Sequence, residues 1–390
     1  MVKRVYLDHS ATTPVRPEVA ELMMTYLTDR FGNPSSLHGF GREAKKGIEN
    51  ARWQVAQVIG AEPEEVIFTS GGTEADNLAI IGTALANQEK GKHIITSSIE
   101  HHAVLDACRY LEKQGFQVTY LPVDEMGSVN PAEVAQAIAD QTILISIMHA
   151  NNEVGTIQPI EEIGQIAKEK GIIFHVDAVQ TFGKVPVNVN ALQVDLLSAS
   201  AHKIYGPKGT GCLYIRQGTR VEPLLHGGSQ EQTQRPGTEN TAGIIGFGLA
   251  AELASQEMAQ NAAHLTQLRE RLVKGITGSI EDVKLNGHPV RRVPGHINVS
   301  FLHLEGESLL FALDMEGIAA SSGSACAAGA IEPSHVLTAI GLPPEVAQAS
   351  VRMTLGRGNT VEDIDYVLEV LPGIVERLRQ TASFSRQAAK

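Results

Sequence analysis

The sequence is poor in cysteine and in basic clusters, and each shortage excludes a class of protein. Its three cysteines, Cys108, Cys212 and Cys326, are too few and too widely spaced for a disulfide framework. The formal net charge is −12, with no basic block of the kind that binds nucleic acid or an anionic membrane. No apolar run is long enough for a signal peptide or a membrane span. We therefore expect an acidic, cytoplasmic protein without nucleic-acid or membrane partners.

The sequence does contain an alternation of short β-branched runs with amphipathic helical patterns. EVIFTS, HIITSS, TILISIMHA and GIIFHVDA are typical of buried strands, and IEEIGQIAKEKG is typical of the helices between them. This spacing favours an α/β domain with a parallel sheet covered on both faces. Near residue 238 the pattern changes to a long helix, with room for one interruption, and then to an α+β region. We expect a large domain at 14–258 and a smaller domain made of 1–13 and 259–390.

One motif is misleading. GFGLAA matches the dinucleotide-binding fingerprint, but it lies inside a helical pattern and follows no strand. Small residues on one face of a helix indicate close packing. We therefore exclude a nucleotide site there.

Reactive side chains follow five successive predicted strands. In open parallel sheets the ligand lies outside the carboxyl ends of the strands, so these side chains are expected to gather. Taken one at a time, each of these residues could equally serve as an ordinary helix cap or turn residue. They are Gly72 and Thr73 in an anion-binding turn, the pair His101 and His102, Asn152, Asp177 with Gln180, and Ser200 with His202 and Lys203.

This set suits a phosphorylated aromatic aldehyde better than a metal. The sequence has no Cys-x-x-Cys or His-Glu-x-x-His pattern and no Walker A loop, and lysine is a poor metal ligand. Lys203 can form a Schiff base, the turn at Gly72 and Thr73 can hold a phosphate, and Asp177 can pair with a pyridinium nitrogen. The residues alone predict pyridoxal 5′-phosphate and no resident metal.

A longer series of motifs resembles the cysteine desulfurases of the class V aminotransferase family. From about residue 4 to residue 370 the chain contains, in the family's order, YLDHSATTP, FGNPSSLHGFGREAK, SGGTEADN, EHHAV, MHANNEVGTIQPI, HVDAVQTFGK, SAHKIYGPKG, RPGTEN, SSGSAC and VRMTLGR. The resemblance implies the fold-type-I architecture of pyridoxal-phosphate enzymes. That architecture has a mainly parallel seven-stranded sheet between helices and a smaller α+β domain.

The resemblance also implies a role for each matching residue. Lys203 would bind the cofactor covalently and take the substrate's α proton, and His101 would stack on the ring and assist proton transfer. Cys326 would attack the substrate sulfur, and Arg352 would hold the substrate carboxylate. The other implied contacts are Gly72, Thr73, Asp177, Gln180, Ser200 and His202 to the cofactor, Asn152 to cofactor and substrate, Asn33 to the substrate, and Thr238 from the second subunit of a homodimer.

The implied reaction removes sulfur from L-cysteine, giving L-alanine and a persulfide on Cys326. The persulfide would pass to an iron–sulfur scaffold or another acceptor, and Cys326 could serve as a transient iron–sulfur ligand. Around it, at about 321–332, small residues predict a loop with little side-chain anchoring. SSGSAC resembles the group I loop of Isc- and Nif-type enzymes. The C-terminal tail departs from the docking segment expected of Isc-type enzymes, so the acceptor stays open.

Two alternatives remain at this stage. A selenocysteine lyase or a cystine C–S lyase could use the same scaffold, although Cys326 in a long loop argues against both. A non-catalytic partner in iron–sulfur assembly could retain the fold, and its lack of cofactor absorbance would distinguish it. Cys108 and Cys212, in helical and strand patterns, are expected to be core residues.

Overall fold

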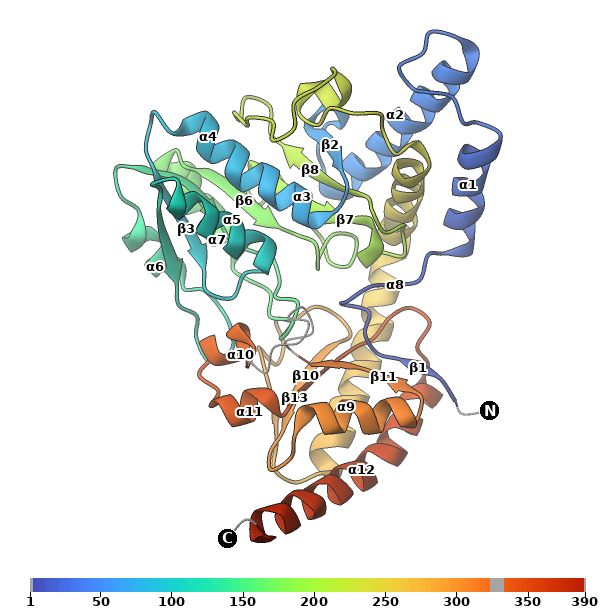
Figure 1. The fold of residues 1–390 in the computed structure, drawn as a ribbon, viewed down its shortest axis with the longest axis vertical. Helices are drawn as coiled ribbons and strands as arrows, with labels where there is room; N and C mark the ends of the chain where they lie inside the picture. Colours follow the sequence, from blue (N-terminus) through green and yellow to red (C-terminus); the bar gives the residue numbers. More distant parts are fainter. Residues whose placement is uncertain (1–2, 323–332, 389–390) are drawn as a thin grey trace.

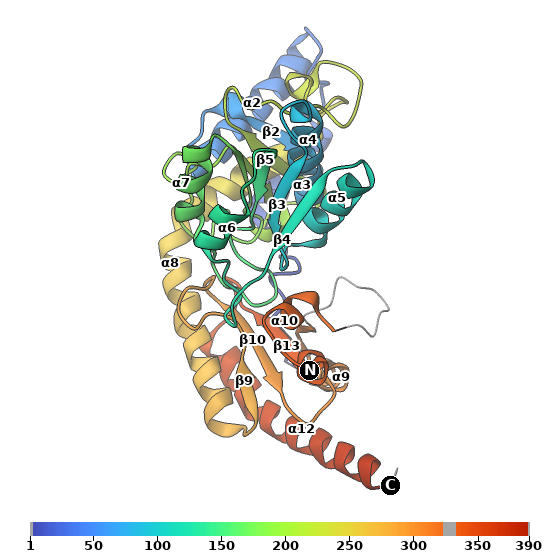
Figure 2. The same ribbon diagram turned by 90° about the vertical axis from the view of Figure 1, so that its left-hand side faces the viewer.

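The structure is a computed structural model that describes residues 3–322 and 333–388, with side chains as far as Thr381. Figure 1 shows a larger part built around one sheet above a smaller part with its own sheet. The long helix α8 (Thr241–Ser279) runs through both parts, and Figure 2 shows it along one edge of the molecule.

The larger sheet has seven strands within the described residues, in the order β2-β8-β7-β6-β5-β3-β4. The five strands from β7 to β4 are parallel, and β8 is antiparallel to both of its neighbours. The expected mainly parallel seven-stranded sheet is therefore confirmed. The strands are β2 (Val66–Thr69), β3 (His93–Ser97), β4 (Gln117–Leu121), β5 (Thr142–Ser146), β6 (Ile173–Asp177), β7 (Leu196–Ser200) and β8 (Gly211–Ile215).

Helices cover both faces of this sheet, because the strands are apolar on both sides. One face packs against α3 (Gly72–Asn77), α4 (Thr83–Asn87) and α5 (His102–Lys113), with one turn of π-helix (Leu78–Gly82) between α3 and α4. The other face packs against α1 (Pro17–Thr28), α2 (Gly39–Ile59), α6 (Pro131–Ala137), α7 (Ile160–Lys170) and the first half of α8. Short 3₁₀ turns lie at Pro63–Glu65, Ala201–Lys203 and Gln230–Thr233.

The helix α8 is continuous over 39 residues, without the interruption that the sequence left open. Its first half joins the core of the large sheet, and its second half joins a separate core in the smaller part. A Cβ at Gly248 would lie 2.5 Å from Cα of Ala51 in α2, and one at Gly246 would lie 2.7 Å from Cγ of Met23 in α1, so the glycines of GFGLAA let α8 approach both helices closely. The interpretation of that motif as a packing motif is confirmed.

The smaller part holds an antiparallel sheet, β12-β13-β10-β9, and a short parallel pair, β1 with β11. The N-terminal strand joins this part, as expected. Its strands are β1 (Val5–Tyr6), β9 (Val283–Leu285), β10 (His296–Phe301), β11 (Ile318–Ala319), β12 (Ser321–Ser322) and β13 (Ser350–Thr354). Its helices are α9 (Gly306–Met315), α10 (His335–Ala339), α11 (Pro344–Gln348) and α12 (Val361–Ala388).

Candidate functional site

Lys203 is the last residue of the 3₁₀ turn that follows β7, which brings its side chain to the carboxyl end of the sheet. Its Nζ donates to the carbonyl oxygen of Ser10 at 2.5 Å and to that of Ala11 at 2.8 Å. Both acceptors belong to the segment that follows β1. The reactive amine is therefore held by backbone oxygens of the N-terminal segment, 193 and 192 residues away in the sequence.

Asp177 is the last residue of β6, next to β7 in the sheet. Its Oδ1 accepts a hydrogen bond from the amide of Val179 at 2.9 Å. Burial raises the pKa of Asp177, although the amide of Val179 and the positive charge of Lys203 lower it. A buried carboxylate with so little compensation favours a cationic partner, which a pyridinium nitrogen would supply.

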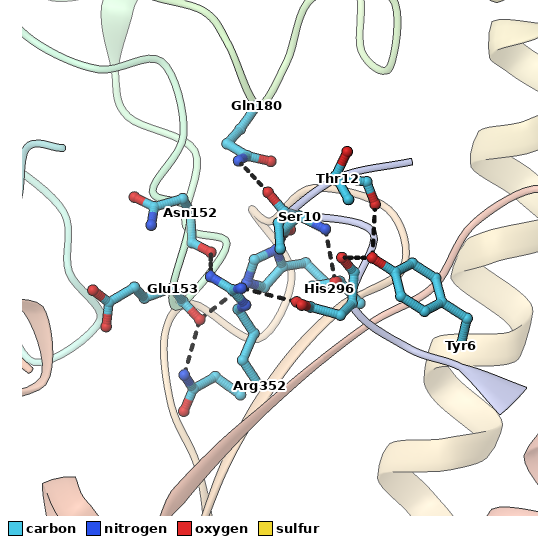
Figure 3. Close-up of polar contacts among 12 residues, drawn as sticks. Tyr6, Ser10, Thr12, Asn152, Glu153, Gln180, His296 and Arg352 are labelled. Atoms are coloured by element: carbon cyan, nitrogen blue, oxygen red, sulfur yellow. Dashed lines mark hydrogen bonds and ion pairs between the residues drawn. The ribbon is translucent and has the colours of Figure 1, made fainter. Parts of the chain in front are cut away.

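Two further polar side chains meet the same N-terminal segment. Nε2 of Gln180 donates to the carbonyl oxygen of Ser10 at 3.1 Å (Figure 3), and its buried Oε1 has no partner among the described residues. Nδ1 of His202 lies 3.1 Å from Oγ1 of Thr12. Ser10 therefore contacts both Lys203 and Gln180.

His101 caps the N-terminus of α5, where its Nδ1 accepts from the amide of Ala103 at 3.1 Å. In the neutral ring the proton then lies on Nε2. Burial and the positive charge of Lys203 lower the pKa of His101 to about 4, so the ring is neutral at pH 7. The ring of His102 instead packs 4.9 Å from that of His335.

The expected anion-binding turn lies in an open hollow near Lys203. A Cβ at Gly72 would lie 2.7 Å from Cγ2 of Val179, so a larger residue would not fit this turn. The hollow collects backbone and side-chain donors suited to a phosphate. It is lined by Ala11, Thr12, Ser70, Gly71, Gly72, Thr73, Glu74, Ser200, His202, Lys208 and Gly209.

Arg352 approaches from the small sheet, on β13, and is almost fully buried. Figure 3 shows its guanidinium among residues of both parts of the molecule. Nη1 donates to the backbone oxygen of Asn152 at 3.0 Å, and Nη2 lies 2.9 Å from Oδ1 of Asp8. Nε is buried and has no partner among the described residues.

Three expected residues are not brought to this site by the described part of one chain. Asn33 is exposed between α1 and α2, where its Oδ1 accepts from the amide of Ser35. Thr238 is exposed before α8, and its expected contact is with a second subunit. Cys326 lies outside the described residues. Burial raises the pKa of Cys108 to about 12, and Cys212 is buried as well, so both fit the expected core positions.

The structure also shows a buried polar cluster that the sequence reasoning missed. Burial raises the pKa of Asp76 well above its usual value, and the nearby charge of Asp177 adds to this. His175 is fully buried, 3.7 Å from Asp76, and contacts the hydroxyls of Ser146 and Ser198. The sequence did contain a signal for this cluster, because His175 is a polar residue inside the otherwise apolar run GIIFHVDA.

No group of three or more His, Cys, Asp or Glu side chains in residues 3–322 and 333–381 is placed to hold a metal ion. Within the described chain, every helix is too short or too polar to cross a membrane.

Comparison with known proteins identifies the family. The model of the class-V aminotransferases matches residues 5–367, nearly the whole chain. The chain belongs to the class-V aminotransferase family. The cofactor of this family is pyridoxal 5′-phosphate, and the residues present fit it: an amine at Lys203, a buried carboxylate at Asp177, an unsatisfied amide oxygen at Gln180 and the hollow rich in donors.

Similar proteins within the family carry one activity in their names. The chain is 56% identical over 387 residues to a cysteine desulfurase IscS of Dictyoglomus turgidum, covering 99% of this chain and 98% of that protein. It is 58% identical over 377 residues to the IscS of Methanosarcina thermophila, covering 97% and 93%. A solved NifS-like protein superposes with a TM-score of 0.91 at 41% identity, covering 96% of this chain and all of that one. These relatives span the fold, including both sheets.

Proposed function

We propose that this chain is a cysteine desulfurase, which converts L-cysteine to L-alanine and leaves a persulfide on Cys326. One observation carries the proposal. Lys203 and Arg352 contact the same N-terminal segment, and the buried Asp177 lies within reach of the charge of Lys203, in a chain that matches named desulfurases over almost its whole length. A lysine, a buried carboxylate and a carboxylate-binding arginine are the groups that an amino acid and this cofactor require.

The chain's residues would hold the cofactor from several sides. Lys203 would bind it covalently, Asp177 would pair with the ring nitrogen, and the hollow that includes Thr73 and His202 would hold the phosphate. Gln180 and Asn152 would contact the ring oxygen, and His101 would stack on the ring. The chemistry that the bound cofactor supplies is the withdrawal of electrons from the bonds at the substrate's α carbon.

Proton movement is assigned to Lys203 and His101. Nζ of Lys203 takes the proton from the α carbon, and the carbonyl oxygens of Ser10 and Ala11 then accept hydrogen bonds from the ammonium. His101 is neutral near pH 7 and presents Nε2–H, because Nδ1 is occupied by the amide of Ala103. His101 is therefore proposed to assist proton transfer through Nε2.

Sulfur transfer is assigned to Cys326. Its thiolate forms a bond to the substrate sulfur while the Cβ–S bond breaks and its electron pair stays on Cβ, which gains a proton. The sulfur is oxidised and the carbon reduced, so no outside oxidant is needed. On either side of this residue, Ser321 pairs with Arg352 in the sheet and Oγ of Ser334 donates to Oε2 of Glu153 at 2.5 Å. Ser321 is thus held beside Arg352, and Ser334 beside Glu153.

The working form is proposed to be a homodimer in the cytoplasm, with Thr238 completing the partner's phosphate site. One group of large exposed apolar side chains supports this, since it lies on α1, on α2 and on the segment between them. They are Met24, Leu27, Phe31, Leu37, Phe40 and Trp53. An iron–sulfur scaffold or another sulfur-acceptor protein is the proposed recipient of the persulfide.

The test is incubation of the purified protein, loaded with cofactor, with L-cysteine. We expect alanine and sulfide in equal amounts in the presence of a reductant, and a persulfide trapped on Cys326 without one. Selenocysteine and cystine serve as competing substrates. Faster turnover of either, with no persulfide on Cys326, would replace this proposal with a lyase.

A further inference from the structure

Arg352 has a resident counter-anion in the substrate-free structure. Oδ1 of Asp8 lies 2.9 Å from Nη2, and this is a contact to one nitrogen rather than a paired, two-bond grip. The guanidinium carries five N–H groups. With the bond from Nη1 to Asn152 also made, the buried Nε still has no partner among the described residues. The arginine therefore keeps donors for a second carboxylate.

The backbone fixes Asp8 in this position. The amide of Thr354 donates to the oxygen of Leu7 at 2.7 Å, and the amide of His9 donates to the oxygen of Thr354 at 3.2 Å. The hydroxyl of Tyr6 donates to the backbone oxygen of Asp8 at 3.0 Å (Figure 3), as does the amide of Ala11. Asp8 is thus bound on both sides, and its carboxylate stays near Arg352 when a ligand enters.

The carboxyl group of Glu153 also feels the charge of Arg352, but it already accepts a hydrogen bond from another residue. Glu153 accepts from the hydroxyl of Ser334, and burial raises the pKa of Glu153 to about 7 even though Arg352 lowers it. The exposed fraction of the Asp8 side chain is 20%, against 4% for that of Arg352. Asp8 is therefore the partner that compensates the buried guanidinium when no substrate is present, since an uncompensated buried charge is costly.

We propose that Asp8 sets the affinity of the substrate-carboxylate site: its carboxylate weakens the attraction of Arg352 for every carboxylate, so that a ligand without an amine binds too weakly to occupy the site. This rests on the proposed role of Arg352 in holding the substrate carboxylate. A simple carboxylate gains one new bond to Arg352 while being repelled by Asp8. An amino acid gains the same bond and a covalent attachment at the cofactor, which outweighs the repulsion. Asp8 thus keeps abundant small anions from occupying the site.

The experiment measures ligand binding to the holoenzyme through the cofactor's visible absorbance, without turnover. L-Alanine carries amine and carboxylate, ethylamine carries only the amine, and acetate is titrated as a competitor of L-alanine. Asp8→Asn keeps the acceptor oxygen and removes the charge. We expect acetate and L-alanine to bind about tenfold more tightly to this variant, and ethylamine to bind as it does to the wild type. Asp8→Ser, which is smaller and neutral, should tighten acetate binding likewise.

Arg352→Gln separates the two possible failures. If acetate binds both Asp8 variants no more tightly than it binds the wild type, while Arg352→Gln abolishes the preference for L-alanine over ethylamine, the role of Asp8 is wrong and that of Arg352 stands. If Arg352→Gln leaves that preference intact, the carboxylate site itself is misassigned. A purely structural role for Asp8 would weaken L-alanine and ethylamine binding together, which also overturns the proposal.

Discussion

Replacing Asp177 with asparagine should stabilise the apoprotein and weaken cofactor binding at the same time. The carboxyl is buried at the end of β6, and among the described residues only the amide of Val179 donates a hydrogen bond to it, at 2.9 Å. Burial raises its pKa in the fold above the usual value of 3.8. The apoprotein therefore bears an unfavourable charge that the bound cofactor's pyridinium would compensate.

The two effects have different sizes and pH dependences. Because the carboxyl's pKa is raised by folding, its ionisation costs stability once the pH exceeds the unfolded value near 4, and the cost is complete above the raised folded pKa. Asp177→Asn removes this cost, so its advantage should grow from pH 5 to pH 8. In the holoenzyme, loss of one partner of a buried ion pair costs about 3–5 kcal/mol, roughly two to four orders of magnitude in cofactor affinity.

Urea unfolding of both apoproteins at pH 5 and pH 8 measures the first effect, and titration of each apoprotein with pyridoxal 5′-phosphate measures the second. Asp177→Glu, which keeps the charge, is the matched control and should retain most of the affinity. The reasoning is refuted if the asparagine variant unfolds at lower urea than the wild type at pH 8. It is equally refuted if the variant binds the cofactor as tightly as the wild type.

Three further outcomes are expected. Lys203→Ala should lose the visible absorbance of the protonated Schiff base yet retain some cofactor through the phosphate hollow, as measured by spectroscopy before and after dialysis. Cys326→Ala should still change colour with L-cysteine but form almost no alanine, whereas Cys108→Ala should stay within a few-fold of the wild type. Glu231→Gln breaks the buried, two-bond pair with Arg52 and should lower the free energy of unfolding by about 3–5 kcal/mol in denaturant titrations, with Glu231→Asp less harmful.

Much of the sheet was predictable because its strands are short, β-branched and buried on both faces. GIIFHVDA predicts β6, and the position of Asp177 at its end follows from the run itself. The antiparallel direction of β8 was not stated in advance, although a signal existed. Only ten residues separate Ser200 from Gly211, too few for the crossover that a parallel neighbour needs.

The contacts of the N-terminal segment could not be predicted, because they are made by backbone oxygens. Nothing in the side chains of Ser10 and Ala11 marks their carbonyls as acceptors for a lysine 193 and 192 residues away. The pair of Asp8 with Arg352 is likewise separated by 344 residues. The motif YLDHSATTP matched the family, but the resemblance implied no role for any of its residues.

The segment from Asp8 to Ala11 links the two ends of the proposed site. Asp8 touches the arginine assigned to the substrate carboxylate, and two residues later the oxygen of Ser10 contacts both Nζ of Lys203 and Nε2 of Gln180. Because Asp8 is also bound to β13 through Thr354, a shift of the small sheet would move acceptors at the reactive amine. The spacing between the carboxylate site and the lysine is therefore set by the turn at residues 8–11, which the bond from the amide of Ala11 to the oxygen of Asp8 closes, rather than by the packing of the two parts alone.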